Sequence, residues 1–216
     1  MNGKHIVLDL DGVLVDGYVA RPGLKEFLAF LFSDPQIETV SIWTASLGWW
    51  PVAYHSMIRK LMPEGKSFWF VWEGDRCTSI FDFDSGERIQ VKPLKKVWKA
   101  FKPRLNKTNT VIFDDSPFTF QRNYGNAIGV KSFEDHHLLE KEDKEFQRLQ
   151  SLLSKYILPA ADVRTAIRSI HPVNFVPFTT TWQQTVESKQ PVPAQAAQIQ
   201  SSDLAPPDSV ASDHST

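Results

Sequence analysis

The sequence predicts an α/β fold: a Rossmann-like layer of parallel strands covered by helices, with a small antiparallel insert and no large cap. Short apolar runs alternate with segments of helical periodicity, which is typical of a parallel sheet. Two of the apolar runs, at residues 6–8 and 110–113, end directly in acidic pairs. The segment between Thr44 and Lys92 has room for only one helix and a small sheet.

The first strands and helices follow from the amino-terminal part of the chain. Residues 6–8 are an apolar run closed by acids and Gly12, as expected for a buried parallel strand that ends in a loop. Pro22 suits a first helical position, and the apolar residues that follow it repeat at helical spacing. These residues are Leu24, Phe27, Leu28 and Leu31. Residues 40–43 predict a second strand, and residues 52–61 predict a second helix.

The middle segment predicts the insert. Residues 68–72 and 79–83 are short runs of high β propensity, and Asp84-Ser85-Gly86 predicts a turn before a third run at residues 88–91. We therefore expect a small antiparallel insert over about residues 67–91.

The remaining body continues the alternation of helices and strands. Apolar spacing at residues 94–101 predicts a helix that is stopped by Pro103. Residues 110–113 predict another buried strand, and residues 138–156 predict an amphipathic helix.

The composition changes after this body. Proline, glutamine and serine become frequent, and no aromatic residue follows Trp182. Such a segment buries too little apolar area to offset its chain entropy. We therefore expect one domain over residues 1–171 and a largely disordered tail over residues 172–216.

Composition and charge disfavour several classes of protein. With 24 Lys and Arg against 25 Asp and Glu among 216 residues, the net charge is −1, which disfavours nucleic acid and anionic membranes as partners. No apolar run approaches the roughly 20 residues that span a bilayer. The single cysteine, Cys77, and the early acidic residue Asp9 favour an intracellular protein, in the nucleus or the cytoplasm.

If the strands at residues 6–8 and 110–113 are central neighbours, three or four carboxylates are expected to converge at one edge of the sheet. Asp9 and Asp11 follow the first strand, and Asp114 and Asp115 follow the strand at residues 110–113. Ligands of open α/β sheets bind beyond the carboxyl ends of the strands. Like charges so close together require a hard cation, and Mg²⁺ is the natural occupant. Of Asp9 and Asp11, one can attack a substrate while the other transfers a proton.

The chemistry that suits this cluster is the hydrolysis of phosphate monoesters. A carboxylate is a weak nucleophile and the ester is anionic, so the attack needs a metal and further polar partners. Thr44, just past the second strand, can donate a hydrogen bond to a phosphoryl oxygen, or it could cap the following helix. Lys92 can bring a positive charge to the same edge, or it could be an exposed lysine at a strand end.

Four segments resemble, in order and spacing, the four motifs of the haloacid dehalogenase superfamily. The closest resemblance is to its RNA polymerase II C-terminal-domain phosphatase-like branch, the NLI-interacting-factor-like family. The segments are residues 9–14, residues 43–46, Lys92 and residues 114–117. Residues 21–24, with Phe27 and Leu28 after them, and residues 126–128 also fit that branch, and the resemblance covers residues 4–156.

The resemblance implies a role for each motif residue. It implies that Asp9 is the nucleophile that becomes an aspartyl-phosphate, and that Asp11 acts first as an acid and then as a base. It also implies that Thr44 and Lys92 bind the phosphoryl group. The Mg²⁺ ligands that it implies are Asp9, the backbone carbonyl of Asp11, Asp115 and, alongside them, Asp114.

The expected activity is Mg²⁺-dependent hydrolysis of phosphoserine or phosphothreonine in a protein, with the RNA polymerase II C-terminal domain as one candidate substrate. A site without a cap is open, which suits a phosphoprotein better than a metabolite. Trp69, Phe70 and Trp72 could form a hydrophobic recess for that substrate, or could pack the insert onto the core. Two alternatives stay open: a small-molecule phosphatase, and a non-catalytic phosphopeptide-binding adaptor of the same fold.

Overall fold

A computed structural model of the chain describes residues 3–47, 52–83, 86–123, 125–134 and 143–174. Its central sheet consists of β1 (Lys4–Leu8), β4 (Ile37–Trp43), β5 (Val71–Trp72), β8 (Thr110–Asp114) and β9 (Ala127–Gly129). The strands lie in the order β5-β4-β1-β8-β9, and each pairs in parallel with its neighbour. The predicted α/β fold with a parallel sheet is therefore confirmed.

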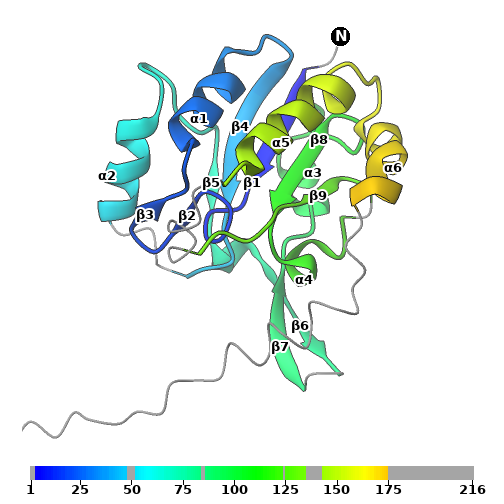
Figure 1. Cartoon of the computed structure of the whole chain (residues 1–216). Helices are drawn as coiled ribbons and strands as arrows, with labels where there is room; N and C mark the ends of the chain where they lie inside the picture. Colours follow the sequence, from blue (N-terminus) through cyan, green and yellow to red (C-terminus); the bar gives the residue numbers. More distant parts are fainter. Residues whose placement is uncertain (1–2, 48–51, 84–85, 124, 135–142, 175–216) are drawn as a thin grey trace, which may run out of the picture. The chain divides into compact units, whose positions relative to one another are not determined.

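Helices cover both faces of this sheet (Figure 1). They are α1 (Leu24–Ser33), α2 (Val52–Leu61), α3 (Lys95–Ala100), the short α4 (Pro117–Phe120), α5 (Glu145–Leu152), which continues as a π-helical turn over Leu153–Ile157, and α6 (Val163–Asn174). In Figure 1, α1 and α5 lie in front of the sheet and α3 lies behind it. None of the described helices is long and apolar enough to cross a membrane.

The strand residues alternate between two separate parts of the core. Ile6 and Leu8 of β1 pack into the larger cluster, which also contains the buried residues of α1, α5 and α6. Val7 and Ile112 point to the other face and pack with Val97 of α3. This two-residue period is what a strand buried on both faces requires, and it explains why the predicted strands are continuous apolar runs.

Helix α1 shows how local sequence sets an element. Its buried residues are Leu24, Phe27, Leu28 and Leu31, which form one apolar face against the core. The helix begins at Leu24, two residues later than Pro22 suggested, because Gly23 takes a positive φ of 79° in front of it. It ends at Ser33, where the backbone N–H of Asp34 donates to the carbonyl of Phe30.

The insert is smaller than predicted. The antiparallel pair is β6 (Thr78–Asp82) with β7 (Glu87–Val91), and it projects away from the sheet in Figure 1. Residues 68–72, which were expected in the insert, instead lead into β5, and β5 extends the central sheet in parallel to β4. This part of the prediction is wrong because β propensity identifies a strand but not its partner.

This correction also moves the three aromatic residues that were expected in the insert. Phe70 is buried in the core cluster under α3, and its ring stacks on Phe101 at a centroid distance of 5.1 Å. Trp69 and Trp72 contact the same Phe101 ring and are partly exposed. These contacts are those of a structural aromatic cluster, and the expected substrate recess stays a prediction for Trp69 and Trp72 alone.

Several elements of the structure have no counterpart among the helices and strands predicted from the sequence. After Asp11 the chain forms a small antiparallel hairpin, β2 (Val15–Asp16) with β3 (Val19–Ala20). The last described helix, α6, buries Val163, Ala166, Ile167 and Ile170, which are spaced as on one helix face.

The predicted domain boundary lies inside a helix. Helix α6 runs to Asn174, past the expected boundary at residue 171. Residues 175–216, which carry most of the predicted tail, lie outside the described residues. The same holds for residues 138–142 of the predicted helix over 138–156.

His5, in β1, is a buried histidine that stays neutral in the folded protein. Its Nδ1 lies 2.8 Å from Thr39 Oγ1, and the residue is only 1% exposed. Burial lowers the pKa of His5 from 6.5 to about 4, outweighing the opposite effect of the Glu38 carboxylate. Below pH 6.5 the unfolded chain binds a proton here that the folded chain binds only near pH 4. The stability due to neutral His5 is therefore complete above pH 6.5 and is lost as the pH falls toward 4.

We expect the free energy of unfolding to fall by about 1–2 kcal/mol between pH 7 and pH 5 through His5 alone. Urea denaturation at both pH values measures the change. His5→Gln keeps a polar partner for Thr39 but does not titrate. The free energy of unfolding of this variant should therefore fall by about 1–2 kcal/mol less than that of the wild type between pH 7 and pH 5. Equal losses in the two proteins would show that His5 is not responsible.

Candidate active site

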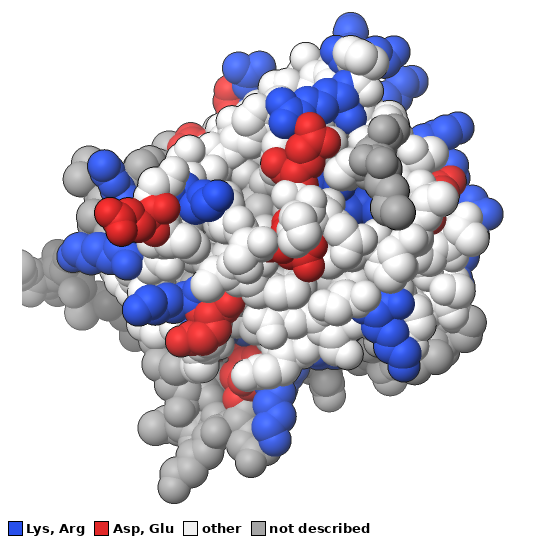
Figure 2. Space-filling model, turned by 90° about the horizontal axis from the view of Figure 1, so that it is seen from above, with Lys and Arg blue, Asp and Glu red and all other residues white. Residues whose placement is uncertain are grey.

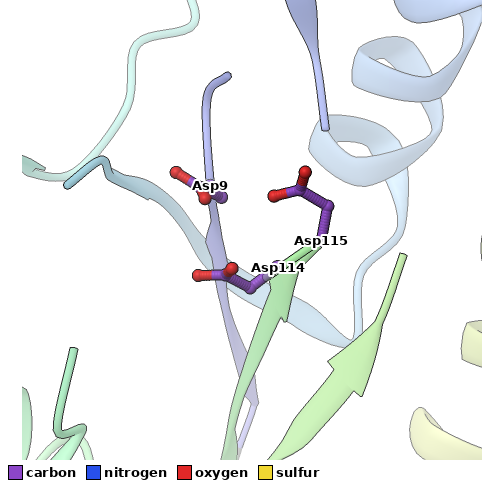
Figure 3. Close-up of side chains that lie close together, drawn as sticks. All are labelled: Asp9, Asp114 and Asp115. Carbon is purple, nitrogen blue, oxygen red and sulfur yellow. The ribbon is translucent and has the colours of Figure 1, made fainter. Parts of the chain in front are cut away.

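Three carboxylates meet at the carboxyl edge of the sheet (Figure 3). Strands β1 and β8 are direct neighbours, so Asp9, which follows β1, lies beside Asp114 and Asp115 at the end of β8. The backbone N–H of Asp9 donates to the carbonyl of Phe113 over 2.8 Å, which fixes the two strand ends together. One oxygen from each of the three carboxylates lies within 4.8 Å of the others. The expected meeting of the two strand ends is thus present.

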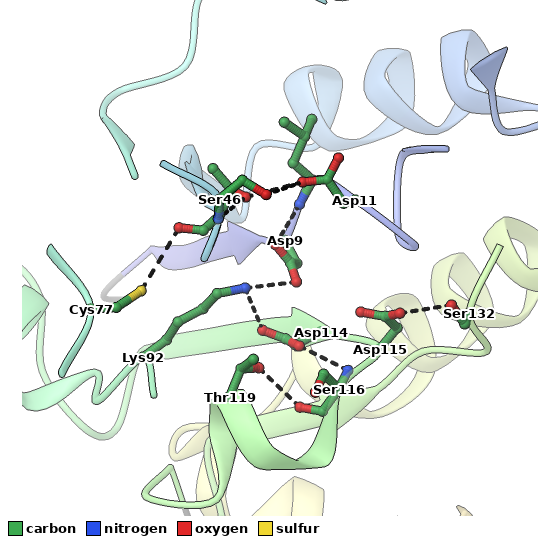
Figure 4. A network of polar contacts seen from close by, with 12 residues as sticks. Asp9, Asp11, Ser46, Cys77, Lys92, Asp114, Asp115, Ser116, Thr119 and Ser132 are labelled. Carbon is green, nitrogen blue, oxygen red and sulfur yellow. Dashed lines mark hydrogen bonds and ion pairs between the residues drawn. The ribbon is translucent and has the colours of Figure 1, made fainter. Parts of the chain in front are cut away.

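Lys92 lies between two of these acids (Figure 4). Its Nζ is 2.6 Å from Asp9 Oδ2 and 2.8 Å from Asp114 Oδ2, and its side chain is completely buried. The lysine follows β7, and its backbone N–H and carbonyl bond Thr119 and Asn123, respectively. The strand β7 of the hairpin therefore ends where Lys92 can place its ammonium group beside Asp9 and Asp114.

The electrostatics of the site show an excess of buried negative charge. Burial raises the pKa of Asp9, and the neighbouring Asp114 carboxylate raises it further, against the effect of Lys92. Burial also raises the pKa of Asp115, again with a contribution from Asp114. Burial alone would lower the pKa of Lys92, but Asp9 and Asp114 outweigh it and keep the pKa above its usual value. Lys92 therefore stays cationic beside its two acids.

Asp11 points to a different set of partners. Its Oδ2 accepts hydrogen bonds from Thr44 Oγ1 at 3.2 Å and from Ser46 Oγ at 2.9 Å. The Asp11 side chain is not part of the three-carboxylate group, and a ligand role through its backbone carbonyl stays a prediction. Thr44 Oγ1 also accepts a hydrogen bond from the backbone N–H of Ser46, which closes a tight turn after β4. This hydrogen bond lies within the turn, so Thr44 does not act as the helix cap that was the alternative prediction.

The structure adds Ser46 and Ser132 to the residues expected at the site. Ser132 Oγ donates to Asp115 Oδ2 over 2.7 Å, which orients that carboxylate. Gly12 lies against the same pair: a Cβ there would be 2.2 Å from Asp115 Oδ2 and 3.0 Å from Ser132 Oγ. Ser46 is part of the motif at residues 43–46, but nothing near Ser132 in the sequence marks it, because it comes from a loop 17 residues beyond Asp115.

Arg21 connects the loops that carry these residues. Its guanidinium donates to the carbonyls of Gly12, Val13 and Lys131, and its Nε donates to Asp143 at 2.8 Å. A fully buried arginine is uncommon, and here its charge is paired with Asp143. The loop after Asp11 is thereby fixed to the loop that carries Ser132.

This arrangement can be compared with known proteins. The family model described as NLI interacting factor-like phosphatase matches residues 4–164. The chain belongs to this family. The resemblance seen in the four motifs is therefore confirmed, and the family match reaches from β1 into α6.

Curated members related to the chain are named Ubiquitin-like domain-containing CTD phosphatase 1. The Xenopus tropicalis protein is 28% identical over 160 residues, and the Homo sapiens protein is 29% identical over 160 residues. In each case the match covers 70% of this chain and 49% of the relative, so the chain spans about half the length of these relatives.

Among solved structures, fission yeast Fcp1, an RNA polymerase II CTD phosphatase bound to beryllium fluoride, is similar with a TM-score of 0.42 and 16% identity. That match covers 87% of this chain and 62% of the Fcp1 chain.

Proposed function

We propose that the chain is a Mg²⁺-dependent phosphoprotein phosphatase that acts on phosphoserine or phosphothreonine through an aspartyl-phosphate at Asp9. The observation that carries the proposal is the meeting of Asp9, Asp114, Asp115 and Lys92 at the carboxyl edge of the sheet. Membership of a phosphatase family supports the same reaction class.

The residues present fit a divalent cation. With all three carboxylates ionised, as they are when they bind a cation, the group made of these acids and Lys92 has two more negative charges than positive ones. All three acids offer the oxygen ligands that Mg²⁺ prefers, and Asp9 and Asp115 would hold it with Asp114 alongside. When bound, Mg²⁺ supplies positive charge that neutralises the phosphoryl oxygens during transfer.

Asp9 is proposed as the nucleophile. Its Oδ1 accepts a hydrogen bond of 2.7 Å from the backbone N–H of Leu10, and its Oδ2 contacts Lys92, so the carboxylate is held in one orientation. A carboxylate oxygen of Asp9 bonds to phosphorus while the bond from phosphorus to the serine or threonine oxygen breaks. Lys92 and Thr44 would hold the phosphoryl oxygens during this step.

Asp11 is proposed as the general acid and then the general base. It gives its proton to the departing serine or threonine oxygen, and afterwards removes a proton from the water that attacks phosphorus. The second attack breaks the bond between phosphorus and Asp9 and releases inorganic phosphate. The hydroxyl groups of Thr44 and Ser46 support this role because they orient the Asp11 carboxylate away from the three-acid group.

A protein substrate is proposed for two reasons. The described residues between Thr44 and Lys92 form α2, the edge strand β5, a short 3-10 turn and the β6–β7 hairpin, and they include no domain-sized cap. The curated relatives are named CTD phosphatases, so the RNA polymerase II C-terminal domain is the first substrate to test. The single cysteine, Cys77, which is a free buried thiol, supports an intracellular setting.

The proposal is tested with the full chain, phosphopeptides of the polymerase C-terminal domain, sugar phosphates and a chromogenic phosphate ester, with Mg²⁺ and with a chelator. We expect Mg²⁺-dependent release of phosphate, with kcat/KM higher for phosphopeptides than for sugar phosphates. Preference for sugar phosphates would contradict the protein substrate. Binding of phosphopeptides with no turnover would indicate an adaptor instead.

Gly12 gives a specific test of the metal site. In Gly12→Ala the new methyl group would displace the Asp115 carboxylate, and the φ of 74° is unfavourable for alanine. We expect Mg²⁺ affinity to fall about 10–100-fold, as when a metal ligand loses its orientation. Titration calorimetry measures the affinity.

The matched control is Gly65→Ala. Gly65 has a similar φ of 69°, but no atom lies within 4 Å of its added Cβ. Both variants should lose about 1–3 kcal/mol of stability from backbone strain. Only Gly12→Ala should lose Mg²⁺ affinity, and unchanged affinity in that variant would argue against Asp115 as a ligand.

A further inference from the structure

Positive charge is concentrated on and after helix α3. Residues 95–107 contain six Lys and Arg and no Asp or Glu, whereas the whole chain has a net charge of −1. All six side chains are exposed. We call them the α3 basic surface: Lys95, Lys96, Lys99, Lys102, Arg104 and Lys107.

This surface runs from the active-site edge of the sheet to the opposite edge. At one end, Lys96 Nζ donates to the carbonyl of Cys77, whose thiol donates to the carbonyl of Thr44, so the first turn of α3 lies at the active-site edge. The surface ends just before Thr110, which pairs with His5 at the amino-terminal side of β1. Arg104 reaches Glu38, near the start of β4. Figure 2 views the molecule from above as drawn in Figure 1, and Lys and Arg gather along the upper margin of that view.

Several of these cations lack a partner among the described residues. Lys96 donates to the carbonyls of Arg76 and Cys77, and Arg104 pairs with Glu38. The side chains of Lys95, Lys99 and Lys102 have no hydrogen bond or ion pair within the described part of the chain. Lys95 and Lys99 are four residues apart, so their like charges lie on one helix face, an arrangement that is unfavourable unless an anion lies between them.

We propose that the α3 basic surface binds further phosphate groups of a multiply phosphorylated protein segment whose phosphoserine or phosphothreonine occupies the Asp9 site. This inference rests on the proposed function and adds a substrate class to it. Lysines bind phosphate as compact, flexible point charges, which suits phosphates at variable spacing along a peptide. Because the first turn of α3 lies at the active-site edge, the rest of a bound phosphopeptide can extend onto this surface.

Two other polyanions fit the surface less well. Single-stranded nucleic acid needs open aromatic faces for stacking, but the guanidinium of Arg104 lies 5.1 Å over the ring of Trp69, the exposed aromatic residue near the surface. A membrane surface needs exposed apolar side chains beside the cations, and no large apolar side chain of residues 95–107 is exposed.

The test compares two triple variants of the full chain. Lys95→Gln, Lys99→Gln and Lys102→Gln together neutralise the surface. Lys25→Gln, Lys60→Gln and Lys66→Gln make the same charge change at exposed lysines on α1, on α2 and in the loop after α2. Substrates are one peptide with a single phosphoserine, the same peptide with three, and a chromogenic phosphate ester.

For the α3 variant we expect kcat/KM on the triply phosphorylated peptide to fall about tenfold, mainly through KM. Its activity on the singly phosphorylated peptide should change little, and its activity on the ester should not change. The control variant should keep the wild-type preference for the triply phosphorylated peptide. The preference of the wild-type protein should weaken as salt is raised.

Equal effects on both peptides, or equal effects of both triple variants, would overturn the inference. Binding of the peptides by fluorescence anisotropy without Mg²⁺ tests the surface even if turnover is absent. Wild-type protein without activity on any ester would overturn the proposed function. Wild-type protein that binds the singly and the triply phosphorylated peptide equally well in this binding assay would overturn the α3 surface instead. Tighter binding to an RNA oligonucleotide or to phosphatidylserine vesicles than to the peptide would also contradict it.

Discussion

Asp9→Asn should abolish phosphatase activity while leaving the protein folded. An amide oxygen cannot form the acyl phosphate, so we expect kcat to fall at least about 10³-fold. The change is nearly isosteric, and Asn can still accept the hydrogen bond that Leu10 donates to Oδ1. Lys92 keeps its ion pair with Asp114, so no buried cation is left without a partner. Steady-state turnover of a chromogenic phosphate ester and the thermal unfolding midpoint measure the two effects.

Asp34→Asn is the matched control, because it makes the same chemical change at a carboxylate whose one hydrogen bond among the described residues comes from the backbone N–H of Gln36. This variant should retain wild-type turnover. Substantial activity in folded Asp9→Asn protein would show that another group attacks phosphorus. An unfolded Asp9→Asn protein would show instead that the Asp9 carboxylate is needed for stability.

Lys92→Met should reduce both activity and stability. Methionine fills a similar volume but leaves Asp9 and Asp114 buried without their cation. Removing one partner of a buried ion pair costs about 3–5 kcal/mol, so urea denaturation without Mg²⁺ should show a loss of this size. Because Mg²⁺ would neutralise the same acids, the loss should be smaller when Mg²⁺ is present. We also expect kcat/KM to fall at least about 10²-fold through the lost phosphoryl contact.

Lys25→Met is the control for removal of an exposed lysine, here one on α1. It should change neither stability nor turnover by a measurable amount. A loss of stability in Lys92→Met that is independent of Mg²⁺ would contradict a metal among Asp9, Asp114 and Asp115. Unchanged kcat/KM in folded Lys92→Met protein would leave Lys92 with a purely structural role.

The strands that place the site could be predicted because their sequence pattern is unambiguous. The continuous apolar runs of β1 and β8 indicate burial on both faces, and acids that directly follow such strands must lie at the carboxyl edge. The meeting of Asp9 with Asp114 and Asp115 needed only that these two strands be neighbours, which the structure shows.

The contacts that orient the site could not be predicted in the same way. Ser132 and Asp115 are 17 residues apart, and Arg21 and Lys131 are 110 residues apart, so no local period or spacing connects them. Such contacts depend on how the loops close over the packed core. A sequence pattern can mark a buried strand but not the path of a loop.

The placement of the aromatic residues 69–72 failed for a different reason. The run has high β propensity, which correctly indicated a strand, but propensity does not distinguish an edge strand of the main sheet from a strand of the insert. Phe101, directly after α3, packs on the rings of Trp69, Phe70 and Trp72, and this contact holds the run against the main sheet. That contact becomes visible only when α3 is seen to cover the face of the sheet beside β5.

The most direct test of the central claim is chemical trapping of the phosphorylated protein. The chain of 216 residues is mixed with Mg²⁺ and a phosphorylated substrate, quenched in acid and treated with borohydride, which reduces an aspartyl-phosphate to homoserine. Peptide mapping by mass spectrometry then locates the modified residue. We expect homoserine at position 9, with none in the presence of a chelator or in Asp9→Asn protein. Phosphate on another residue, or turnover with no modification at position 9, would contradict it.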